Sequence, residues 1–433
     1  MLLEKELGLI ERSYYEASVT RPVPTPPLAT RINVDVCVVG GGYSGLSAAL
    51  ELALRGYRVA LLEAQRIGWG ASGRNGGQAI VGFGTEGERL IERQCGLDEA
   101  RRAWDISVAG LELLRARIAR YCIDCDYTAG YLNAAVKPSK VPVLKRWAEH
   151  LQKHYCYPLQ FLDRAALRAW IDSERFQAAT YDSNSGHLHP LRYCLGLAAA
   201  ASSAGVQIFE GSAVRYIHRG QRPLLKTALG EVSCEFVVLA GNVYLGEYGA
   251  AIAPELAKRI IPVGTYIVAT EVMAPARANA LLPRRTAVSD TNFILDYFRL
   301  SADNRLLFGA GENLTGNTPR HLLADMRRRL IAVFPQLADV TIKYAWGGFV
   351  DLTLNHAPNF GRIGHNIYYL QGYSGHGLAF SGIAGKLVAD ALAGQAEHFD
   401  LFAKINHHSF PLGPLRTPAL LLGMWYYRLR DWL

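Results

Sequence analysis

The chain has 433 residues, half of them hydrophobic and 19% charged, which is typical of a globular protein and excludes a chain that is disordered throughout. Its length suffices for two domains with full cores. The formal net charge of +8 comes from scattered Lys and Arg residues with no nucleic-acid-binding motif behind them, so we expect no nucleic-acid partner.

Cysteine usage and the N-terminal sequence indicate a compartment. The seven cysteines are irregularly placed, and the pair Cys122 and Cys125 lacks the second pair or the histidines of a zinc site. No basic segment followed by an apolar one marks a signal peptide, and no stretch approaches the roughly 18–20 apolar residues of a membrane span. We therefore expect a reduced, cytoplasmic protein without a metal site.

Residues 1–30 form a predicted N-terminal arm. The arm holds a short helical piece and the proline-rich segment Arg21–Pro27. Prolines cannot continue a helix, so this segment is expected to be extended and to lead into the first strand.

A strand, a glycine turn, a helix, a second strand and an acid then follow in that order. Asp35–Val39 is the first predicted strand, Gly40–Gly45 is a GxGxxG turn, Leu46–Arg55 is the helix, and Gly56–Glu63 is the second strand. A dinucleotide site requires this order. The alternative is a tight strand-to-helix turn that binds nothing.

Each part of the turn has a predicted task. Gly40 allows the tight turn, Gly42 lets a pyrophosphate approach the backbone, and Gly45 lets the helix pack close to the strand. The helix N-terminus offers unpaired N–H groups and the positive end of its dipole to the phosphates. Glu63, 18 residues after Gly45, is placed to accept hydrogen bonds from a ribose 2′-hydroxyl.

Small residues are concentrated in the next segment, Gly68–Gln78. Its glycines let the backbone approach a flat, bulky ligand closely, and Arg74 and Asn75 supply polar contacts. A helical pattern then covers about residues 86–121, and helix-like and strand-like segments mix up to about residue 180.

The second half of the chain returns to small-residue turns. An alanine-rich helix at Pro190–Ala204 precedes strand patterns that end near Val214. The buried strand Glu235–Leu239 opens into Ala240-Gly241-Asn242, as expected where the edge of a sheet meets a cofactor. Strand patterns fill residues 260–345 around one helix at about 320–333, and Ile367–Gln371 ends in a last glycine turn and helix.

These patterns predict an α/β fold with a discontinuous cofactor domain. Residues 40–78, 211–242 and 372–380 would meet in one site. We assign residues 31–100, 187–255 and 345–400 to a Rossmann-like cofactor domain, and residues 101–186 and 256–344 to a second, α+β domain whose antiparallel sheet covers the site. Residues 401–433 form a tail whose aromatic residues and arginines suit a bilayer surface, although a helix packed on the protein body is favoured.

With these motifs in place, the chain resembles the D-amino-acid oxidase superfamily of FAD-dependent amine oxidoreductases. The resemblance rests on the GxGxxG turn with Glu63, on Ala71–Gly77, on Trp346-Gly347-Gly348 and on Gly372–Gly377, which together span nearly the whole chain. Four further segments resemble the branch that oxidises γ-glutamylputrescine in polyamine catabolism: residues 13–18, 296–301, 305–309 and 416–418.

This resemblance implies FAD as the cofactor and a small-molecule amine as the substrate. The expected reaction oxidises a C–N bond of γ-glutamylputrescine or a related primary or secondary amine to an imine, which hydrolyses to an aldehyde, while O2 becomes H2O2. The alternatives are a D-amino-acid or glycine-type dehydrogenase that passes electrons to a quinone, and a flavin-binding protein without turnover.

Two departures from the covalently flavinylated sarcosine oxidases bear on the cofactor. No Cys occurs in Phe349–Thr353 and no His lies between Glu63 and Gln78, so FAD is expected to be held without a covalent bond. The strand Arg305–Gly309 carries no Lys of the kind that activates oxygen in those enzymes, which leaves open whether O2 or a quinone accepts the electrons.

The resemblance also marks the residues expected to contact FAD. The turn Gly375–Leu378, with a helix after it, is expected to donate backbone hydrogen bonds to the flavin edge. The full set is Gly40, Gly42, Tyr43, Ser44, Gly45, Glu63, Ala64, Arg66, Ala71, Ser72, Arg74, Asn75, Gly76, Gly77, Gln78, Val214, Ala240, Gly241, Asn242, Trp346, Gly375, His376, Gly377 and Leu378.

Four residues are candidates for the chemistry. His376 has an ordinary pKa of about 6.5, which suits a proton shuttle, although a ring that only braces the turn is favoured. Tyr297 and Arg299 alternate along one predicted strand and so share a face, where Tyr297 would pack beside the flavin and Arg299 would pair with a substrate carboxylate. Glu312 would hold a cationic amine. The alternatives are a solvated strand residue for Arg299 and a loop acid for Glu312.

Overall fold

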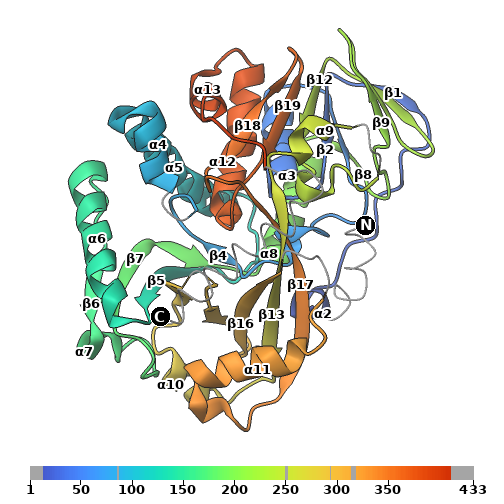
Figure 1. Ribbon diagram of the computed structural model, residues 1–433. Coiled ribbons are helices and arrows are strands. Elements are labelled where there is room, and N and C mark those ends of the chain that lie inside the picture. Colours follow the sequence, from blue (N-terminus) through green and yellow to red (C-terminus); the bar gives the residue numbers. More distant parts are fainter. Residues whose placement is uncertain (1–12, 85–86, 249–251, 293, 314–317, 411–433) are drawn as a thin grey trace.

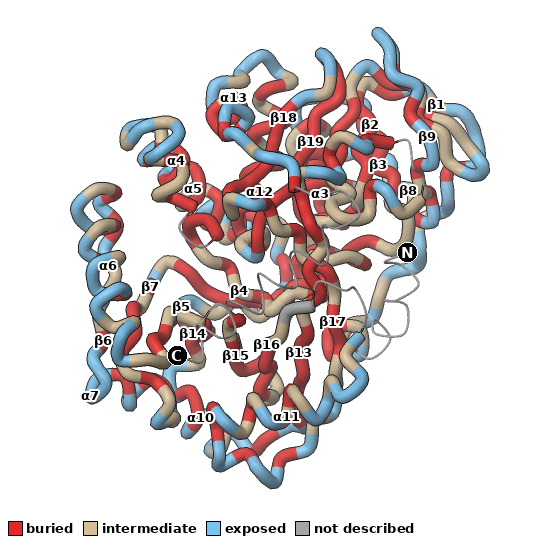
Figure 2. Tube along the Cα trace, in the orientation of Figure 1, coloured by how far each residue is buried: buried red, intermediate tan, exposed pale blue. Residues whose placement is uncertain are grey.

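The computed structural model describes residues 13–84, 87–248, 252–292, 294–313 and 318–410. Within these ranges the strands form three sheets, and Figure 1 shows the parallel sheet with its helices in the upper part and the largest sheet below it. In Figure 2 the strands are buried along most of their length, whereas the outer faces of the helices are exposed.

The first large sheet is covered on one face by helices and on the other by a smaller sheet. Its order is β18-β19-β12-β2-β3-β8, and every neighbouring pair is parallel except β18 with β19. The side chains of β2 alternate: Val36 and Val38 face the helices, and Cys37 and Val39 face a small four-stranded sheet, β1-β11-β10-β9. Burial on both faces explains why its strands consist almost entirely of apolar residues. The bounds of the large sheet's strands are β2 (Val36–Val39), β3 (Val59–Leu62), β8 (Gln207–Phe209), β12 (Phe236–Leu239), β18 (Asn359–Ile363) and β19 (Ile367–Gln371). Those of the small sheet are β1 (Arg31–Asn33), β9 (Tyr216–His218), β10 (Leu224–Lys226) and β11 (Glu231–Ser233).

Two helices on this parallel sheet pack against each other closely enough to exclude a side chain at their contact. Helix α3 (Tyr43–Leu54) follows the first strand, and α12 (Gly377–Leu392) follows β19. A Cβ added to Gly385 of α12 would lie 2.6 Å from the Ala48 nitrogen of α3, so only glycine permits this approach. Helices α8 (Pro190–Ser203), α5 (Leu97–Arg120) and α13 (Glu397–Ala403) complete the layer.

The second large sheet has order β17-β13-β16-β15-β14-β5-β7-β4, with β6 paired to β7. Its pairs are antiparallel except β14 with β5. Phe298, Phe308 and Leu132 pack on one face against the helices α7, α10 and α11, whereas Trp346, Ile267 and Leu307 point to the opposite face. We call the latter the inner face. The strand bounds are β4 (Gln78–Ala79), β5 (Thr128–Ala135), β6 (Gln160–Asp163), β7 (Ala178–His187), β13 (Ile261–Thr270), β14 (Ala287–Asp290), β15 (Tyr297–Leu300), β16 (Leu306–Asn313) and β17 (Ile342–Leu352).

The remaining described helices are short or peripheral. They are α2 (Tyr14–Ala17), α4 (Gly87–Cys95), α6 (Val141–Tyr155), α7 (Arg164–Leu167), α9 (Pro254–Ala257), α10 (Pro275–Leu281) and α11 (Leu322–Val333), with 3-10 turns η1 (Ala71–Gly73), η2 (Pro138–Lys140), η3 (Asn242–Tyr244) and η4 (Pro335–Leu337). No single helix in the described ranges is long and apolar enough to cross a membrane; α12 and α13 pass that test only as a pair bent by 117°. The expected tail lies outside the described residues from residue 411 onwards.

The predicted α/β class with a parallel cofactor sheet is confirmed, and the structure adds detail to it. The helical pattern over residues 86–121 is divided into α4 and α5 at Gly96, whose φ of +87° interrupts a helix. The domain boundaries stay a prediction. The pairing places β4 and β17 in the second large sheet, although residues 78–79 and 345–352 belong to the segments assigned to the cofactor domain.

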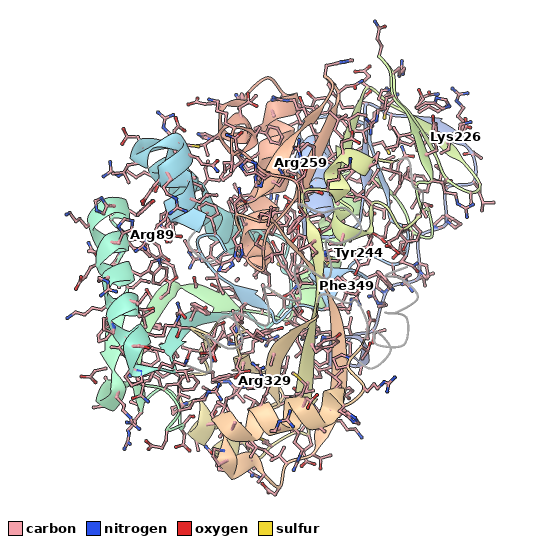
Figure 3. The ribbon with its side chains drawn as sticks, viewed as in Figure 1. Arg89, Lys226, Tyr244, Arg259, Arg329 and Phe349 are labelled. Atoms are coloured by element: carbon pink, nitrogen blue, oxygen red, sulfur yellow. The ribbon has the colours of Figure 1, made fainter. Side chains whose placement is uncertain are left out.

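A buried acid cluster joins β14 to β15. Asp290 is buried beside Asp296, and Arg175 Nη2 lies 3.7 Å from Asp290 Oδ2 and 3.0 Å from Asp296 Oδ2. Arg329 on α11, labelled in Figure 3, pairs with Asp296 at 2.7 Å. Burial, and next the charge of Asp296, raise the pKa of Asp290 from 3.8 to about 7.

Asp290→Asn should therefore change stability in a pH-dependent way. The pKa of Asp290 in the folded state lies above its ordinary value, so its contribution to stability is present at low pH and is lost as the pH rises from 3.8 through about 7. We expect the Tm of the variant, relative to the wild type, to be higher at pH 8 than at pH 5. Thermal unfolding between pH 5 and 8 measures this, with Asp98→Asn, whose side chain is 90% exposed, as the control. A Tm difference that is constant across the range would contradict the expectation.

Candidate functional site

A hollow of about 750 Å³ opens at the carboxyl ends of β2, β3 and β12. In doubly wound sheets this is where nucleotides bind. Ten of the residues expected to contact FAD line it: Gly40, Gly42, Glu63, Ala64, Ala71, Ser72, Val214, Ala240, Gly241 and Asn242. Val39, Gly41, Leu62, Trp69, Gly70, Tyr244, Leu245, Tyr248 and Ile252 complete the lining.

The glycine turn at this hollow has no room for side chains. Gly40 has a φ of +112°, and a Cβ there would lie 2.6 Å from the Ala240 carbonyl oxygen of the neighbouring strand's turn. A Cβ on Gly45 would lie 1.9 Å from the Gly40 carbonyl oxygen. Gly42 caps α3 without a side chain, which opens the first turn of the helix, with its positive dipole end, to an anion.

Glu63 is oriented by backbone donors. Its Oε2 accepts from the Gly41 amide at 2.6 Å and its Oε1 from the Gln65 amide at 2.8 Å. Burial raises the pKa of this carboxyl. Across the hollow, Asn242 Oδ1 is buried and has no hydrogen-bond partner among the described residues. An orphaned acceptor and an anchored carboxyl in a glycine-lined hollow fit the ribose hydroxyls and pyrophosphate of FAD.

Three of the expected contact residues near the turn act in packing. The Tyr43 hydroxyl donates to the Pro190 carbonyl oxygen at 2.9 Å, and Ser44 Oγ shares a hydrogen bond of 2.6 Å with the Tyr373 hydroxyl. Both side chains are buried, as is Gly45. Arg66 does not line the hollow, because its guanidinium pairs with Glu210 at 3.1 Å and donates to the Pro22 carbonyl oxygen at 2.8 Å.

Arg74 joins the small-residue segment to β17. Its Nη1 donates to the Gly347 carbonyl oxygen at 3.1 Å, and Trp346 Nε1 donates back to the Arg74 carbonyl oxygen at 3.0 Å. Arg74 Nη2 also donates to the Tyr244 hydroxyl at 3.2 Å. Figure 3 labels Tyr244 and Phe349 where η3 and β17 are in contact. The motif Trp346-Gly347-Gly348 therefore holds the small-residue segment in place through Arg74, and Trp346 itself is fully buried.

The rest of this segment is held by its own amide groups. Asn75 Nδ2 donates to the Ala71 and Ser72 carbonyl oxygens at 3.0 and 3.1 Å, and Asn75 Oδ1 accepts from the Gly77 amide at 2.8 Å. Gln78 Nε2 donates to the Val288 carbonyl oxygen at 3.0 Å, and its Oε1 accepts from Ser289 Oγ at 2.9 Å. These contacts preset the backbone path that a flat ligand would follow.

Arg299 contacts the same segment from the inner face. Its Nε donates to the Gly76 carbonyl oxygen at 2.7 Å, and its Nη2 donates to the Tyr15 hydroxyl at 3.1 Å. Tyr15, on α2, is fully buried and packs edge-on against Trp346, with ring centroids 5.1 Å apart. Tyr297 shares the face, as expected, and its ring lies under Gly76 and Gly309. Arg299 is only 4% exposed, so the arginine proposed for a substrate carboxylate already holds the backbone of the cofactor segment.

The last glycine turn is anchored by a buried acid. Asp351, at the end of β17, accepts hydrogen bonds from the Gly372 and Tyr373 amides, and burial raises its pKa. The residues that follow this anchored turn differ in exposure: Gly375 is exposed, His376 and Gly377 are half-buried, and Leu378 is buried. Burial lowers the pKa of His376 to about 4, so its ring is neutral at neutral pH.

The remaining candidate for the chemistry is Glu312. It falls in β16, and its side chain lies outside the described part of the structure. No group of three metal-binding side chains occurs among the described residues.

Sequence patterns missed several residues that shape the site. Asp351, Tyr244 and Tyr15 lie outside the glycine motifs, and Trp69 lies inside the segment Gly68–Gln78 but was not among the residues expected to contact FAD. Asp351 follows the Trp346 motif closely, and Tyr15 belongs to a segment noted in the family resemblance. The sequence therefore placed both residues near family motifs but did not indicate which groups they would contact. Trp69 was indicated only by its place between two glycines of the small-residue segment, and Tyr244 had no signal, because an aromatic residue in a loop is equally compatible with packing.

Comparisons with known proteins place this geometry in context. A family model described as FAD dependent oxidoreductase, DAO, matches residues 35–391. γ-Glutamylputrescine oxidoreductase of Escherichia coli (strain K12) is 43% identical over 420 residues, covering 97% of this chain and 98% of that protein. A probable oxidoreductase, OrdL, of Haemophilus influenzae is 41% identical over 423 residues, covering 97% of each.

Solved structures share the fold. Glycine oxidase from Geobacillus kaustophilus superposes with a TM-score of 0.70 at 23% identity, covering 84% of this chain and 95% of that chain. L-Proline dehydrogenase from P. horikoshii gives a TM-score of 0.71 at 22% identity, with 87% and 98% covered. At these identities the likeness concerns the fold.

Gly45→Ala should abolish cofactor retention. The new Cβ would overlap the Gly40 carbonyl oxygen, so the turn must open and the amides at the start of α3 must move. We expect the FAD content of the purified protein to fall about tenfold or more, together with a lower Tm. Flavin absorbance per protein measures the content. Gly220→Ala, where a Cβ meets no atom within 4 Å, is the matched control, and an equal effect of both variants would contradict the contact.

Arg299→Lys should loosen FAD rather than the substrate. A lysine keeps the charge but cannot donate to Gly76 and Tyr15 together, so we expect an FAD Kd raised about tenfold with a smaller change in KM for the amine. Tyr15→Phe should act in the same direction. Tyr14→Phe is the control, because the Tyr14 hydroxyl donates to Asp303 at 2.7 Å instead. Normal FAD affinity with a raised KM for carboxylate-bearing substrates would return Arg299 to its predicted substrate role.

Proposed function

The chain belongs to the DAO family of FAD-dependent oxidoreductases, and on this premise we propose that it oxidises the C–N bond of γ-glutamylputrescine or a closely related amine. The observation that carries the proposal is the 43% identity, over nearly the full length of both chains, to the Escherichia coli protein named for that substrate. Two electrons and two protons leave the amine, O2 takes them to form H2O2, and water converts the imine to an aldehyde and ammonia.

The residues present divide between the two ends of the cofactor. The hollow around Gly40, Glu63 and Asn242 would hold the adenosine and pyrophosphate end. The segment from Ala71 to Gln78 and the turn Gly375–Leu378 would hold the flavin ring. When bound, FAD supplies the two-electron acceptor for the amine.

The chain's own contribution is position, charge and exclusion of water. The N-terminus of α12 presents backbone N–H groups and a positive dipole end beside His376, which favours negative charge there. Asp351 keeps that turn in place through its two backbone contacts. Burial lowers the pKa of His376 to about 4, so at neutral pH its neutral ring is a weak base that serves as a hydrogen-bonding group rather than as a proton carrier.

Cysteine chemistry supports two further parts of the proposal. All seven cysteines are free, which is usual in a reducing cytoplasm, and we place the enzyme there. Cys194, whose Sγ lies 3.8 Å from the Gly41 carbonyl oxygen, is buried, and burial raises its pKa to about 12, so it is poorly suited to form a bond to FAD. FAD is accordingly held without a covalent bond.

Anaerobic reduction of the purified flavoprotein tests the proposal. We expect γ-glutamylputrescine to bleach the visible flavin absorbance within seconds, and air to restore it with release of peroxide. Putrescine, glycine and D-alanine serve as comparison substrates. Bleaching by an amino acid alone, or recovery only with a quinone, would favour the dehydrogenase alternative, and no bleaching by any amine would leave a flavin-binding protein without turnover.

A further inference from the structure

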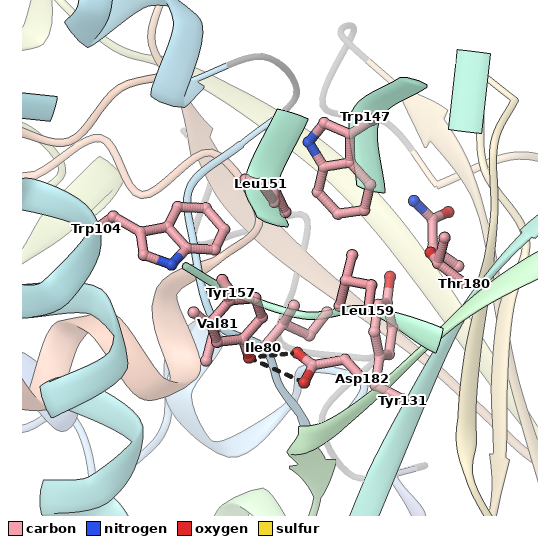
Figure 4. Close-up of a pocket in the computed structure, with 11 residues that line it drawn as sticks. Ile80, Val81, Trp104, Tyr131, Trp147, Leu151, Tyr157, Leu159, Thr180 and Asp182 are labelled. Atoms are coloured by element: carbon pink, nitrogen blue, oxygen red, sulfur yellow. Dashed lines mark hydrogen bonds between the residues drawn. The ribbon is translucent and has the colours of Figure 1, made fainter. Parts of the chain in front are cut away.

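A second cavity, of about 280 Å³, lies on the inner face of the large sheet, apart from the nucleotide hollow. Figure 4 shows it between Trp104 of α5, Trp147 and Leu151 of α6, and the strands that carry Tyr131 and Asp182. This volume includes the part that is open to solvent, so the space suits one end of a small molecule rather than a whole cofactor.

Asp182 places a buried carboxylate at this cavity. The Tyr157 hydroxyl donates to both of its oxygens at 2.9 Å, Ser185 Oγ to Oδ2 at 2.5 Å, and the Asn184 amide to Oδ1 at 2.9 Å. These three donors leave part of the four-site acceptor capacity of a carboxylate unused. All three are neutral, so none offsets a negative charge.

No ion pair reaches Asp182 from the residues that the structure describes. Arg115, a cation on the neighbouring helix, donates to the Asn184 carbonyl oxygen at 3.4 Å instead. Buried carboxylates normally have a cationic partner, because an isolated charge is costly to remove from water. A ligand that brings an ammonium group would supply that partner.

The walls suit an ammonium group as well. Trp104, Trp147, Tyr131 and Tyr157 present four aromatic rings around the space, and aromatic faces attract cations. Trp104 is 3% exposed, and its Nε1 is buried without a hydrogen-bond partner among the described residues. In Figure 4 this nitrogen is on the side of Val81 and Tyr157. A donor without an acceptor is matched by a carboxylate on the same ligand.

A chain of hydrogen bonds connects the cavity to the cofactor segment. Gln78, the last residue of that segment, accepts from Ser289, and Ser289 is hydrogen bonded to Tyr131 in the cavity wall. Ile80 and Val81, which follow β4 directly, also line the cavity. The cavity therefore adjoins the segment on which the flavin ring is expected.

We propose that this cavity binds the remote end of the amine substrate, a zwitterionic α-amino acid group whose ammonium pairs with Asp182 and whose carboxylate accepts from Trp104. This inference rests on the function proposed above and assigns the γ-glutamyl end of its substrate. The reacting amine then points away from Asp182 toward the cofactor segment. The cavity distinguishes γ-glutamylputrescine from putrescine and from N-acetylputrescine, which lack the amino acid group.

Steady-state kinetics of Asp182→Asn test the assignment. We expect KM for γ-glutamylputrescine to rise about tenfold or more with kcat changed less than about twofold, because the lost ion pair lies far from the reacting bond. KM for N-acetylputrescine should be unchanged. Trp104→Phe, which removes the N–H donor and shortens the side chain but keeps one aromatic ring, should raise the same KM. Glu92→Gln is the matched control, since Glu92 binds Tyr155 and His150 outside the cavity. Equal effects on both substrates, or no effect on either, would overturn the assignment.

A binding measurement separates this inference from the proposed function. γ-Glutamylethylamide carries the amino acid group but no terminal amine. We expect it to change the tryptophan fluorescence of the wild-type holoenzyme and to bind about tenfold more weakly to Asp182→Asn or, should that variant not fold, to Trp104→Phe. Absence of turnover with γ-glutamylputrescine would overturn the proposed function. Binding of γ-glutamylethylamide that is absent, or equal in wild type and variants, would overturn the cavity assignment alone.

Discussion

The contact between Gly45 and the carbonyl oxygen of Gly40 is the constraint on which the cofactor site depends. It brings the start of α3 against the end of β2 with no space for a methyl group. That approach directs the first turn of the helix, with its unpaired amides and positive dipole end, at the hollow. The same closeness recurs where Gly385 of α12 meets α3, so the two helices that present their N-termini to the site are fixed relative to each other.

A second set of contacts ties the small-residue segment Ala71–Gly77 to the second large sheet. Arg74 binds β17, Trp346 binds back to Arg74, and Arg299 holds Gly76 while reaching Tyr15. Charged side chains buried this deeply are stable only with several hydrogen bonds each. Their cost is offset by a segment whose backbone is already in place before a ligand arrives, which reduces the entropy lost on binding.

In the proposed function, the flavin segment and the Asp182 cavity bind opposite ends of a long, flexible substrate. The reacting end needs a preset flavin segment, whereas the remote end needs recognition by charge and shape. The Asp182 cavity lies on strands β5 and β7, and the flavin segment reaches the same sheet through β4. One sheet therefore sets the distance between recognition and chemistry. Enzymes that share this fold can change substrate by changing the walls of such a cavity while the cofactor site stays the same.

Local sequence patterns were sufficient to predict the part of the site that is formed by one continuous stretch of the chain. The order of strand, glycine turn, helix and acid from Asp35 to Glu63 predicted the parallel sheet and three residues of the hollow, Gly40, Gly42 and Glu63, because glycine spacing and backbone geometry are properties of neighbouring residues. The α/β class followed from the same patterns. The division of the pattern over residues 86–121 at Gly96 was not predicted, since one glycine in a long apolar pattern is equally compatible with a continuous helix.

Residues that act across the chain could be assigned only from the tertiary structure. Arg299 was expected to face a substrate, but it is buried against Gly76 and Tyr15, which lie 223 and 284 residues away in the sequence. Asp351 gained its role by reaching the Gly372 and Tyr373 amides, and Asp182 became notable because its hydrogen-bond donors among the described residues are all neutral. The sequence by itself determined the backbone motifs, because these depend on local sterics, and its resemblance to a family indicated FAD as the cofactor. Tertiary packing decided which charged side chains bind the protein and which remain for a ligand, because that depends on partners that spacing along the chain does not reveal.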